Sequence, residues 1–416
     1  MTPLAADTPI CVVGAGILGA SAALHLVRAG ARNVTLIDAG DPLSGTTPAG
    51  AGFVAAFAAD TNRRFHRGCV PLEIYGIEFY RSLHEAGHDL DFAANGNLVL
   101  ALTEESLDRL RAGIMEHPDR LPGTRVLDPA QIQEMTSGAV DADKIAGGIF
   151  MAEGIQLTTG KAVVAILDDL AGAGVSVRHN TRVTGIRTQD GAVTGVETAD
   201  GAIPAQAVVI ACGAWSNEVL ATVGWRLPLV PVVATRFVTR DVGLSPTMPT
   251  VQCPDLGLWI RELDGAYSWG VGTAYRRASL LQDDGVDPSA IGRPHSPSLI
   301  EMQRGSQPDV AEVFPALNGE EPELITQGMP CYSADGNLYV GPVPSCRGVW
   351  LIGGDNESGV THGPGMGRLV AELMMGDEPL TDPAPFRLDR TTPQDFPDEE
   401  AAVRAMAEDR IATAMG

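Results

Sequence analysis

Three glycines near the amino terminus have the type and spacing needed to hold a charged cofactor. An apolar run that begins at Ile10 leads into Gly14, Gly16 and Gly19 in the pattern GxGxxG. We expect Gly14 to make the turn, Gly16 to let a pyrophosphate approach the main chain, and Gly19 to let a helix pack on the strand. The amino terminus of that helix then faces the phosphates.

Asp38 completes this pattern. It follows a second apolar run, Val34 to Ile37, at the place where a carboxylate can accept hydrogen bonds from an adenosine ribose. An acid there disfavours a ribose 2′-phosphate and therefore disfavours NADP. Strand, turn, helix, strand and acid together predict a Rossmann-like dinucleotide-binding unit.

Length and composition set the surroundings of this unit. A chain of 416 residues suggests two domains. Its net charge of −23, from 52 acidic and 29 basic residues, predicts that neither nucleic acid nor an anionic membrane is a partner. The first residues lack the layout of a signal peptide and no apolar run is long enough to span a membrane, so we expect a cytoplasmic protein. We expect it to be a monomer or a homodimer. The scattered cysteines predict free thiols and no metal site.

Two later segments repeat the change from apolar strand to glycine turn. Ala207 to Ala211 runs into Cys212 and Gly213, and Val349 to Ile352 runs into Gly353 and Gly354. Turns of this kind, returning from distant parts of the chain, predict one parallel sheet assembled from separate segments. Glycine would lie wherever the main chain passes close to a ligand.

The segment from Pro228 to Gly328 has a different pattern. Its β-rich runs, at 230–239, 258–262 and 267–273, predict an antiparallel sheet. The predicted fold is therefore α/β, with a Rossmann-like domain and an interleaved α+β substrate domain. We assign 1–91, 143–227 and 329–395 to the first domain, 92–142 and 228–328 to the second, and 396–416 to an acidic helical tail.

Nearly the whole chain resembles the flavin amine oxidoreductases of the D-amino acid oxidase type. The residues that carry the resemblance are GAGILG with Asp38, Val208 to Ser216, Ser333 to Gly336, Gly359 to Gly367 and Pro385 to Arg390. This resemblance implies that the cofactor is FAD. It also implies that the turn at Cys212 to Trp215 contacts the flavin, and that a helix beginning near Gly365 directs its positive end at the flavin pyrimidine.

An oriented helix terminus of that kind would stabilise the negative charge that develops on the flavin ring, with Gly363, Gly365 and Gly367 clearing space for the ring. The full set of residues expected to contact FAD is Gly14, Gly16, Ile17, Gly19, Asp38, Ala39, Thr46, Thr47, Val183, Cys212, Gly213, Trp215, Gly354, Gly363, Gly365, Met366 and Gly367.

Departures from the family pattern are informative too. Pro330 and Thr361 stand where relatives carry cations for the substrate carboxylate, and Gly270 stands where sarcosine oxidase has a lysine that activates oxygen. Pro48 replaces the histidine that bonds covalently to flavin in dimethylglycine dehydrogenases. The resemblance therefore implies noncovalent FAD. It leaves the electron acceptor open between oxygen and an unknown carrier.

Other side chains are candidates for the substrate site. Arg236 and Arg261 can bind a carboxylate or phosphonate, unless they form ordinary surface ion pairs. Tyr267, Trp269 and Tyr332 can wall an amine pocket, unless they pack in a core. His362 follows Val360-Thr361, a run similar to the dimethylglycine branch, and is either near the reactive carbon or a packing residue. The candidate catalytic set is His362, Tyr267, Arg261 and Tyr332.

The favoured function is oxidation of the C–N bond of a small-molecule amine or N-alkyl amino compound to an imine, by hydride transfer to flavin N5. One alternative is oxidation of a 2-hydroxy acid or related alcohol, which needs a base such as His362. A second alternative is a noncatalytic flavin-binding subunit of a larger dehydrogenase. In that case the acidic stretch from Asp398 to Met415 would be either a docking helix or a solvated one.

Overall fold

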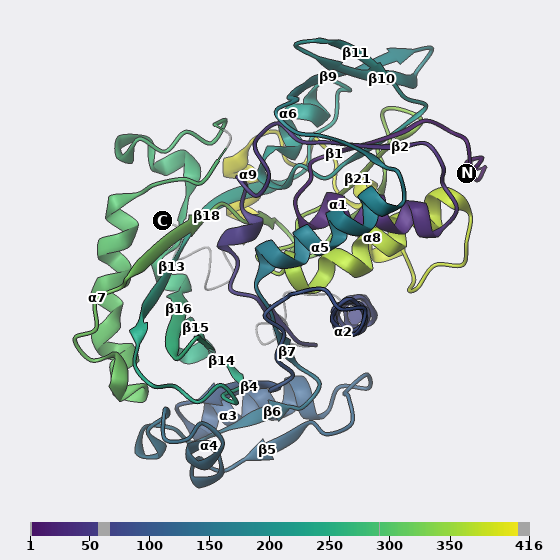
Figure 1. The fold of residues 1–416 in the computed structure, drawn as a ribbon. Coiled ribbons are helices and arrows are strands. Elements are labelled where there is room, and N and C mark those ends of the chain that lie inside the picture. Colours follow the sequence, from purple (N-terminus) through teal and green to yellow (C-terminus); the bar gives the residue numbers. More distant parts are fainter. Residues whose placement is uncertain (1, 57–66, 291, 407–416) are drawn as a thin grey trace.

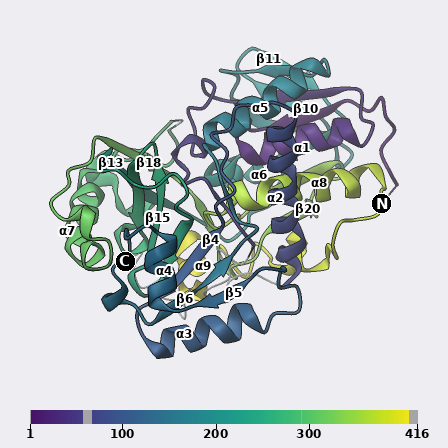
Figure 2. The same ribbon diagram turned by 60° about the horizontal axis from the view of Figure 1, so that its bottom comes forward.

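The computed structural model describes residues 2–56, 67–290 and 292–406. In both Figure 1 and Figure 2 the helix α7 lies at the edge of the molecule farthest from α1 and α8. One sheet lies beside α7, and another lies beside α1 and α8. The helices of the described chain are α1 Ile17–Arg28, α2 Val70–Glu85, α3 Glu104–Leu110, α4 Pro129–Met135, α5 Thr159–Gly172, α6 Ser216–Ala221, α7 Pro297–Val313, α8 Gly359–Met375 and α9 Glu399–Met406.

The first sheet has the order β20-β21-β12-β1-β2-β8. All neighbours in it are parallel except β20 with β21. Its central strands are fully buried apolar runs, as expected for parallel strands covered on both faces. The predicted sheet built from separate segments is therefore confirmed, with strands β1 Ile10–Val13, β2 Val34–Ile37, β8 Ser176–Arg178, β12 Ala207–Ile210, β20 Tyr339–Pro342 and β21 Val349–Gly353.

Helices α1, α2 and α8 pack tightly against one another through glycines of α8. A Cβ atom on Gly363 would lie 3.3 Å from Ile17 of α1, and one on Gly367 would lie 2.6 Å from Ser21 of the same helix. On Gly365 it would lie 2.7 Å from Leu72 of α2. The expectation that these glycines clear space for a flavin ring is wrong, because neighbouring helices fill that space.

The second sheet has ten strands, eight on its main path and two, β18 and β19, that pair with β13 beside it, and most of its pairs are antiparallel. One face packs against α7, with Tyr267, Trp269 and Phe237 in the shared core. Strands β6 and β19 also belong to this sheet, so the sheet includes residues beyond 92–142 and 228–328, the ranges expected for the substrate domain. Its strands are β4 Asn97–Ala101, β5 Arg125–Leu127, β6 Gly147–Met151, β13 Leu229–Asp241, β14 Thr250–Cys253, β15 Leu258–Leu263, β16 Ala266–Val271, β17 Arg276–Arg277, β18 Leu324–Gly328 and β19 Cys331–Ser333.

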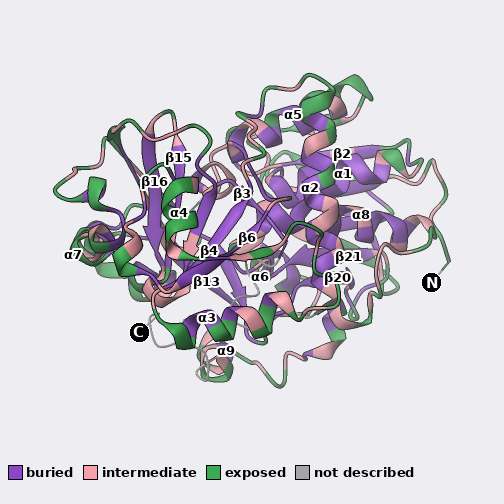
Figure 3. Cartoon of the chain, turned by 90° about the horizontal axis from the view of Figure 1, so that it is seen from below, coloured by how far each residue is buried: buried purple, intermediate pink, exposed green. Residues whose placement is uncertain are grey.

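Smaller elements complete the fold. The strands β9 Val183–Gln189, β10 Ala192–Thr198 and β11 Gly201–Pro204 form a three-stranded antiparallel sheet, and β3 Phe53–Val54 pairs with β7 Ile155–Gln156. Figure 3 shows buried strands and a largely exposed outer surface on α4 and α5. In the part of the chain that is described, no helix is long and apolar enough to cross a membrane.

The tail is docked on the chain itself. Helix α9 buries Ala402 in a cluster that includes Tyr275 and Tyr332. Arg277, which is almost fully buried, lies 2.6 Å from Glu400 at the start of this helix. The tail residues 407–416 lie outside the described residues.

Candidate active site

A cavity of about 940 Å³ extends from the β1–α1 turn to the strands of the second sheet. Several of the residues expected to contact the cofactor or substrate line it. They are Gly14, Gly16, Ile17, Asp38, Ala39, Thr46, Thr47, Val183, Cys212, Gly213, Trp215 and Tyr332.

The β1–α1 turn is built for close main-chain contacts. Gly14 has a φ of +103°, and a Cβ atom there would lie 2.4 Å from the carbonyl oxygen of Ala211. A Cβ on Gly19 would lie 1.7 Å from the carbonyl oxygen of Gly14, so helix and strand meet as expected. A Cβ on Gly16 would meet only Thr47 Oγ1, at 3.2 Å. Gly16 is thus the glycine of this turn that borders the cavity with space beside it.

Asp38 also lines the cavity and is held in place by the main chain. Its Oδ2 atom accepts a hydrogen bond from the Ala15 amide at 2.7 Å, and its Oδ1 atom accepts one from the Gly40 amide at 2.9 Å. Thr47 Oγ1 accepts from the Ile17 amide at 3.1 Å. A glycine turn, a helix amino terminus and a fixed carboxylate on one elongated cavity fit a dinucleotide.

Gly19 and the carboxyl-terminal part of the predicted cofactor set lie elsewhere. Gly19, Gly354, Gly363, Gly365, Met366 and Gly367 do not line the cavity. Helix α8 begins at Gly359, before the expected start near Gly365, so its first turn at Gly359, Val360 and Thr361 lines the cavity instead. A helix amino terminus does therefore face the cavity, but through residues that the glycine pattern did not indicate.

Arg236 and Arg261 form the far end of the site. Arg236 lines the cavity, and Arg261 Nη2 would lie 3.5 Å from a Cβ atom on the cavity residue Gly52. Arg261 is 2% exposed. Among the described residues neither guanidinium has an acidic partner within 4.0 Å, and the Nε atoms of both are buried without a hydrogen bond.

Burial lowers the pKa of Arg261 to about 10, and the charge of Arg236 lowers it further. Burial likewise lowers the pKa of Arg236 to about 10, with a contribution from Arg293. Both groups are still charged near neutral pH. A buried cation and a partly buried one, close together and without a counter-ion among the described residues, strongly favour an anionic ligand.

The aromatic wall differs from the expected one. Tyr267 and Trp269 lie on the face of β16 that packs against α7, where Tyr267 contacts Phe314 and Trp269 contacts Phe237 edge to face. They do not line the cavity, because alternate residues of a strand face opposite sides. The cavity is lined instead by Trp259 and Tyr275, together with Tyr332.

His362 is not at the cavity. It is fully buried in α8, and its Nε2 atom lies 3.2 Å from Oε1 of Glu73, a buried residue of α2. The expectation that His362 lies near the reactive carbon is therefore wrong, because the side chain points into the contact between two helices. The structure instead agrees with the other expectation for His362, that it is a packing residue.

Glu357 was not anticipated from the sequence. This cavity residue accepts hydrogen bonds from the hydroxyl groups of Tyr275 and Tyr332, one on each carboxylate oxygen. Trp259 Nε1 in turn donates to the Tyr275 hydroxyl oxygen at 2.8 Å. Glu357 follows Asp355-Asn356 in a loop that carries no recognisable pattern, so only the three-dimensional structure reveals the cluster.

The parallel sheet, its glycine turn and a cavity shared with a second sheet define a dinucleotide-binding protein with room for a second ligand. The chain belongs to the family of FAD dependent oxidoreductases named DAO, whose pattern matches residues 9–373. FAD is thus its cofactor, and the residues around the β1–α1 turn fit it.

Three relatives illustrate the family. The chain is 26% identical over 389 residues to 4-methylaminobutanoate oxidase (formaldehyde-forming) of Paenarthrobacter nicotinovorans, covering 91% of this chain and 45% of that protein. It is 28% identical over 386 residues to glycine oxidase of Pseudomonas aeruginosa, covering 91% of this chain and 97% of that protein. The crystal structure of iminodiacetate oxidase from Chelativorans sp. BNC1 superposes with a TM-score of 0.74 at 25% identity, covering 91% and 98% of the two chains. The chain thus spans less than half of the first relative.

Proposed function

We propose that this protein oxidises the C–N bond of an N-alkylamino carboxylate, a compound that carries a secondary or tertiary amine and an acid group. The observation that carries the proposal is the cavity itself. The glycine turn expected to hold FAD lines one part of it, and Arg236 lines another part with Arg261 buried next to the cavity residue Gly52; neither arginine has an acidic partner within 4.0 Å among the described residues.

The acid group is the part of the substrate for which the structure offers the clearest partner. A guanidinium can bind a carboxylate through two parallel hydrogen bonds. A substrate carboxylate there would compensate two charges that have no acidic partner within 4.0 Å in the part of the chain that the structure describes. The names of two relatives fit this chemistry, since 4-methylaminobutanoate and iminodiacetate each combine a secondary amine with a carboxylate.

The chain's own residues bind, orient and shield the substrate. Arg236 and Arg261 anchor the acid, and Trp259 and Tyr332 confine the carbon chain between the anchor and the cofactor end. FAD, held by the residues around Gly14, Gly16 and Asp38, would supply the acceptor for a hydride from the carbon beside the amine nitrogen. The resulting imine is released to water and hydrolyses. Positioning of the carbon and exclusion of bulk water are the protein's main contributions.

The two alternatives have less support. Oxidation of a 2-hydroxy acid needs a base beside the hydroxyl group, and His362, the histidine nominated for it, lies in a helix contact with Glu73. A noncatalytic subunit would present its tail to another protein, whereas α9 packs on Tyr275 and Tyr332 of its own chain.

A visible-absorption experiment tests this function. The purified holoenzyme is mixed anaerobically with N-alkylamino carboxylates, with simple amines or with 2-hydroxy acids, and bleaching of the flavin band is followed. We expect amino carboxylates to bleach the flavin fastest. Bleaching by hydroxy acids alone would establish the first alternative. No bleaching across a broad panel would favour the second.

A further inference from the structure

Four buried polar side chains form a row across the second sheet. This polar row consists of Ser268, Arg261, Thr250 and Asn97, and each of them is at most 2% exposed. We propose that the polar row, together with Gln156, binds the acid end of the substrate and a hydrogen-bond donor on the carbon next to the acid group. This inference rests on the proposed function and narrows its substrate class.

Strand pairing brings the four residues of the polar row together. Ser268 of β16 pairs with Arg261 of β15, and Thr250 of β14 pairs with Asn97 of β4. The antiparallel register of β14 with β15 places Thr250 next to Arg261. Neighbours of this kind share a face of the sheet and have Cβ atoms about 5 Å apart. Asn97 Nδ2 also donates to Thr250 Oγ1 at 2.7 Å.

The polar row adjoins the cavity. Trp259 lines the cavity and is two residues from Arg261 in β15, so the two side chains lie on the same face of the sheet. Gly52 also lines the cavity, and a Cβ atom on it would lie 3.5 Å from Arg261 Nη2. The guanidinium is therefore next to the cavity wall at Trp259 and Gly52.

The short strands β3 and β7 cover the polar row. A Cβ atom on Gly154, which precedes β7, would lie 2.8 Å from the Cβ atom of Asn97. Gln156 of β7 pairs with Phe53 of β3, whose ring meets Trp259 edge to face. Because paired residues share a face, Gln156 also points toward the sheet that carries the polar row. Gln156 is itself buried.

Four polar atoms in this region have no hydrogen-bond partner in the described chain. They are Nε of Arg261, Oγ of Ser268, Oδ1 of Asn97 and Oε1 of Gln156. The first is a donor, the hydroxyl group donates or accepts, and the two amide oxygens accept. Buried polar groups are normally paired, because an unpaired one costs free energy. Four of them in one place indicate a ligand that supplies the missing partners.

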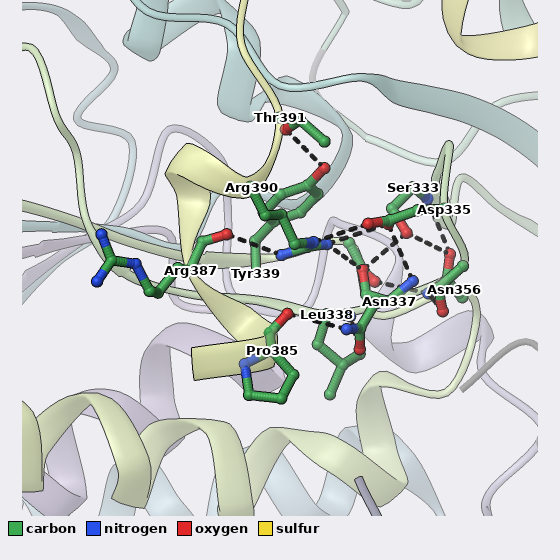
Figure 4. Close-up of polar contacts among 12 residues, drawn as sticks. Ser333, Asp335, Asn337, Leu338, Tyr339, Asn356, Pro385, Arg387, Arg390 and Thr391 are labelled. Carbon is green, nitrogen blue, oxygen red and sulfur yellow. Dashed lines mark hydrogen bonds and ion pairs between the residues drawn. The ribbon is translucent and has the colours of Figure 1, made fainter. Parts of the chain in front are cut away.

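Another polar cluster of the protein shows the usual, paired arrangement (Figure 4). There Asn356 accepts a hydrogen bond from the Ser333 amide at 2.8 Å and donates one to the carbonyl oxygen of Gly354 at 2.8 Å. Arg390 pairs with Asp335, with 2.7 Å between Nε and Oδ2. The polar side chains of this cluster are satisfied by their protein neighbours, whereas those of the polar row are not.

The unpartnered atoms define the chemistry of the ligand. A carboxylate offers two acceptor oxygens, which the guanidinium of Arg261 and the hydroxyl group of Ser268 can bind. A carboxylate has no hydrogen to donate to Gln156 Oε1, so the ligand needs a donor of its own beside the acid. A hydroxyl or N–H group on the adjacent carbon meets this requirement, and a plain alkanoate does not.

Two isosteric acids test this requirement on the FAD-loaded protein. The acids are 2-hydroxy-2-methylpropanoate and 2,2-dimethylpropanoate, in which a hydroxyl group and a methyl group replace each other. Neither has a hydrogen atom on the carbon beside the carboxylate, so FAD cannot take a hydride from that carbon. We expect calorimetry to show that the wild-type protein binds the hydroxy acid at least about tenfold more tightly.

Substitutions separate recognition of the donor from recognition of the acid. Gln156→Leu should remove the preference for the hydroxy acid and change the affinity for 2,2-dimethylpropanoate by less than about twofold. Ser268→Ala should weaken both acids about tenfold, and Arg261→Met should weaken both at least about a hundredfold. Gln133→Leu, at an exposed position of α4, is the matched control. Circular dichroism reports whether each variant is folded.

Equal affinities of the wild-type protein for the two acids would overturn the inference and would mean that water alone fills the polar row. A wild-type protein that binds neither acid, or a preference that survives in folded Gln156→Leu, would overturn it as well. The proposed function fails differently. If N-alkylamino carboxylates do not bleach the flavin while the binding results hold, C–N oxidation is wrong and the binding site stands.

Discussion

The two ends of the cavity are made in different ways. At the cofactor end the main chain does most of the work, since Gly14 and Gly19 sit where a Cβ atom would overlap a carbonyl oxygen. At the substrate end the contacts come from long side chains of β13 and β15, chiefly Arg236, Trp259 and Arg261. A backbone site of the first kind admits almost no substitution, whereas a side-chain site of the second kind can change its ligand by one substitution. The fold can therefore keep its cofactor while its substrate changes.

The largest effect is expected at the cofactor end. Gly16→Val should abolish retention of FAD, because a branched side chain would project into the cavity beside the helix amino terminus. The fold itself should survive, since a Cβ atom here meets only Thr47 Oγ1. Absorbance of the purified protein reports the flavin, and circular dichroism reports the fold.

Gly14→Ala provides the contrast within the same turn. Its Cβ atom would lie 2.4 Å from the carbonyl oxygen of Ala211 at a φ of +103°, so this variant should lose stability as well as FAD. A Gly16→Val protein with a full flavin spectrum would show that FAD does not lie against the main chain at Gly16.

At the substrate end, Arg261→Met should lower kcat/KM for acidic amines by at least about a hundredfold, the usual result of removing a buried cation from an ion pair with ligand. The same variant should unfold less easily. A guanidinium whose pKa falls to about 10 on folding destabilises the folded protein at every pH below 10, by on the order of 3 kcal/mol.

The stabilisation should be constant from pH 6 to 9 and fade only as pH rises above about 10 toward the higher pKa of an arginine in the unfolded chain. Chemical denaturation at two pH values measures it. A less stable Arg261→Met protein would show that the guanidinium has a counter-ion after all.

Reaction with oxygen should show an intermediate effect. A Cβ atom on Gly270 would lie 2.3 Å from Trp259 Cζ2, so the indole ring covers the position that resembles the oxygen-activating lysine of sarcosine oxidase. Without a fixed cation there, reoxidation by air should be about tenfold slower than by an artificial electron carrier. Stopped-flow reoxidation of the reduced protein measures both rates. Faster oxidation by air would contradict this expectation.

The smallest effect is expected where helix α9 packs against Tyr275 and Tyr332, which line the cavity. Arg277→Ala removes the ion pairs with Glu399 and Glu400 that fasten α9 over Tyr275 and Tyr332. Because Glu400 is largely exposed, the loss should be about 1 kcal/mol in the free energy of unfolding. FAD content should be unchanged. A loss of FAD in this variant would mean that the two ends of the cavity are not independent.

The same contrast explains what the sequence could predict. Gly14, Gly16 and Asp38 were identified because a main-chain site leaves a fixed local spacing of residue types. Helix α8 was placed too late, because Gly363, Gly365 and Gly367 have a pattern that serves helix packing and ligand approach alike. Glycine alone does not tell which neighbour comes close.

At the substrate end local spacing carries less information. Tyr267 and Trp269 were assigned to the cavity, but the face of β16 that points inward depends on its pairing with β15, where Gly270 lies opposite Trp259. Trp259 and Arg261 are two residues apart in one strand, so the sequence alone could have placed both on one face. Glu357 could not be found, because its partners come from Tyr275 and Tyr332, far away in the chain.

The central claim is that the cavity joins FAD to an acid-binding end. It is tested most directly by anaerobic reduction of the wild-type flavin with a matched pair, 4-(methylamino)butanoate and its primary amide, 4-(methylamino)butanamide. The two differ only in the charge that Arg236 and Arg261 would bind. We predict a rate of flavin reduction per unit concentration at least about a hundredfold higher for the acid. Equal rates for the acid and the amide would contradict the account.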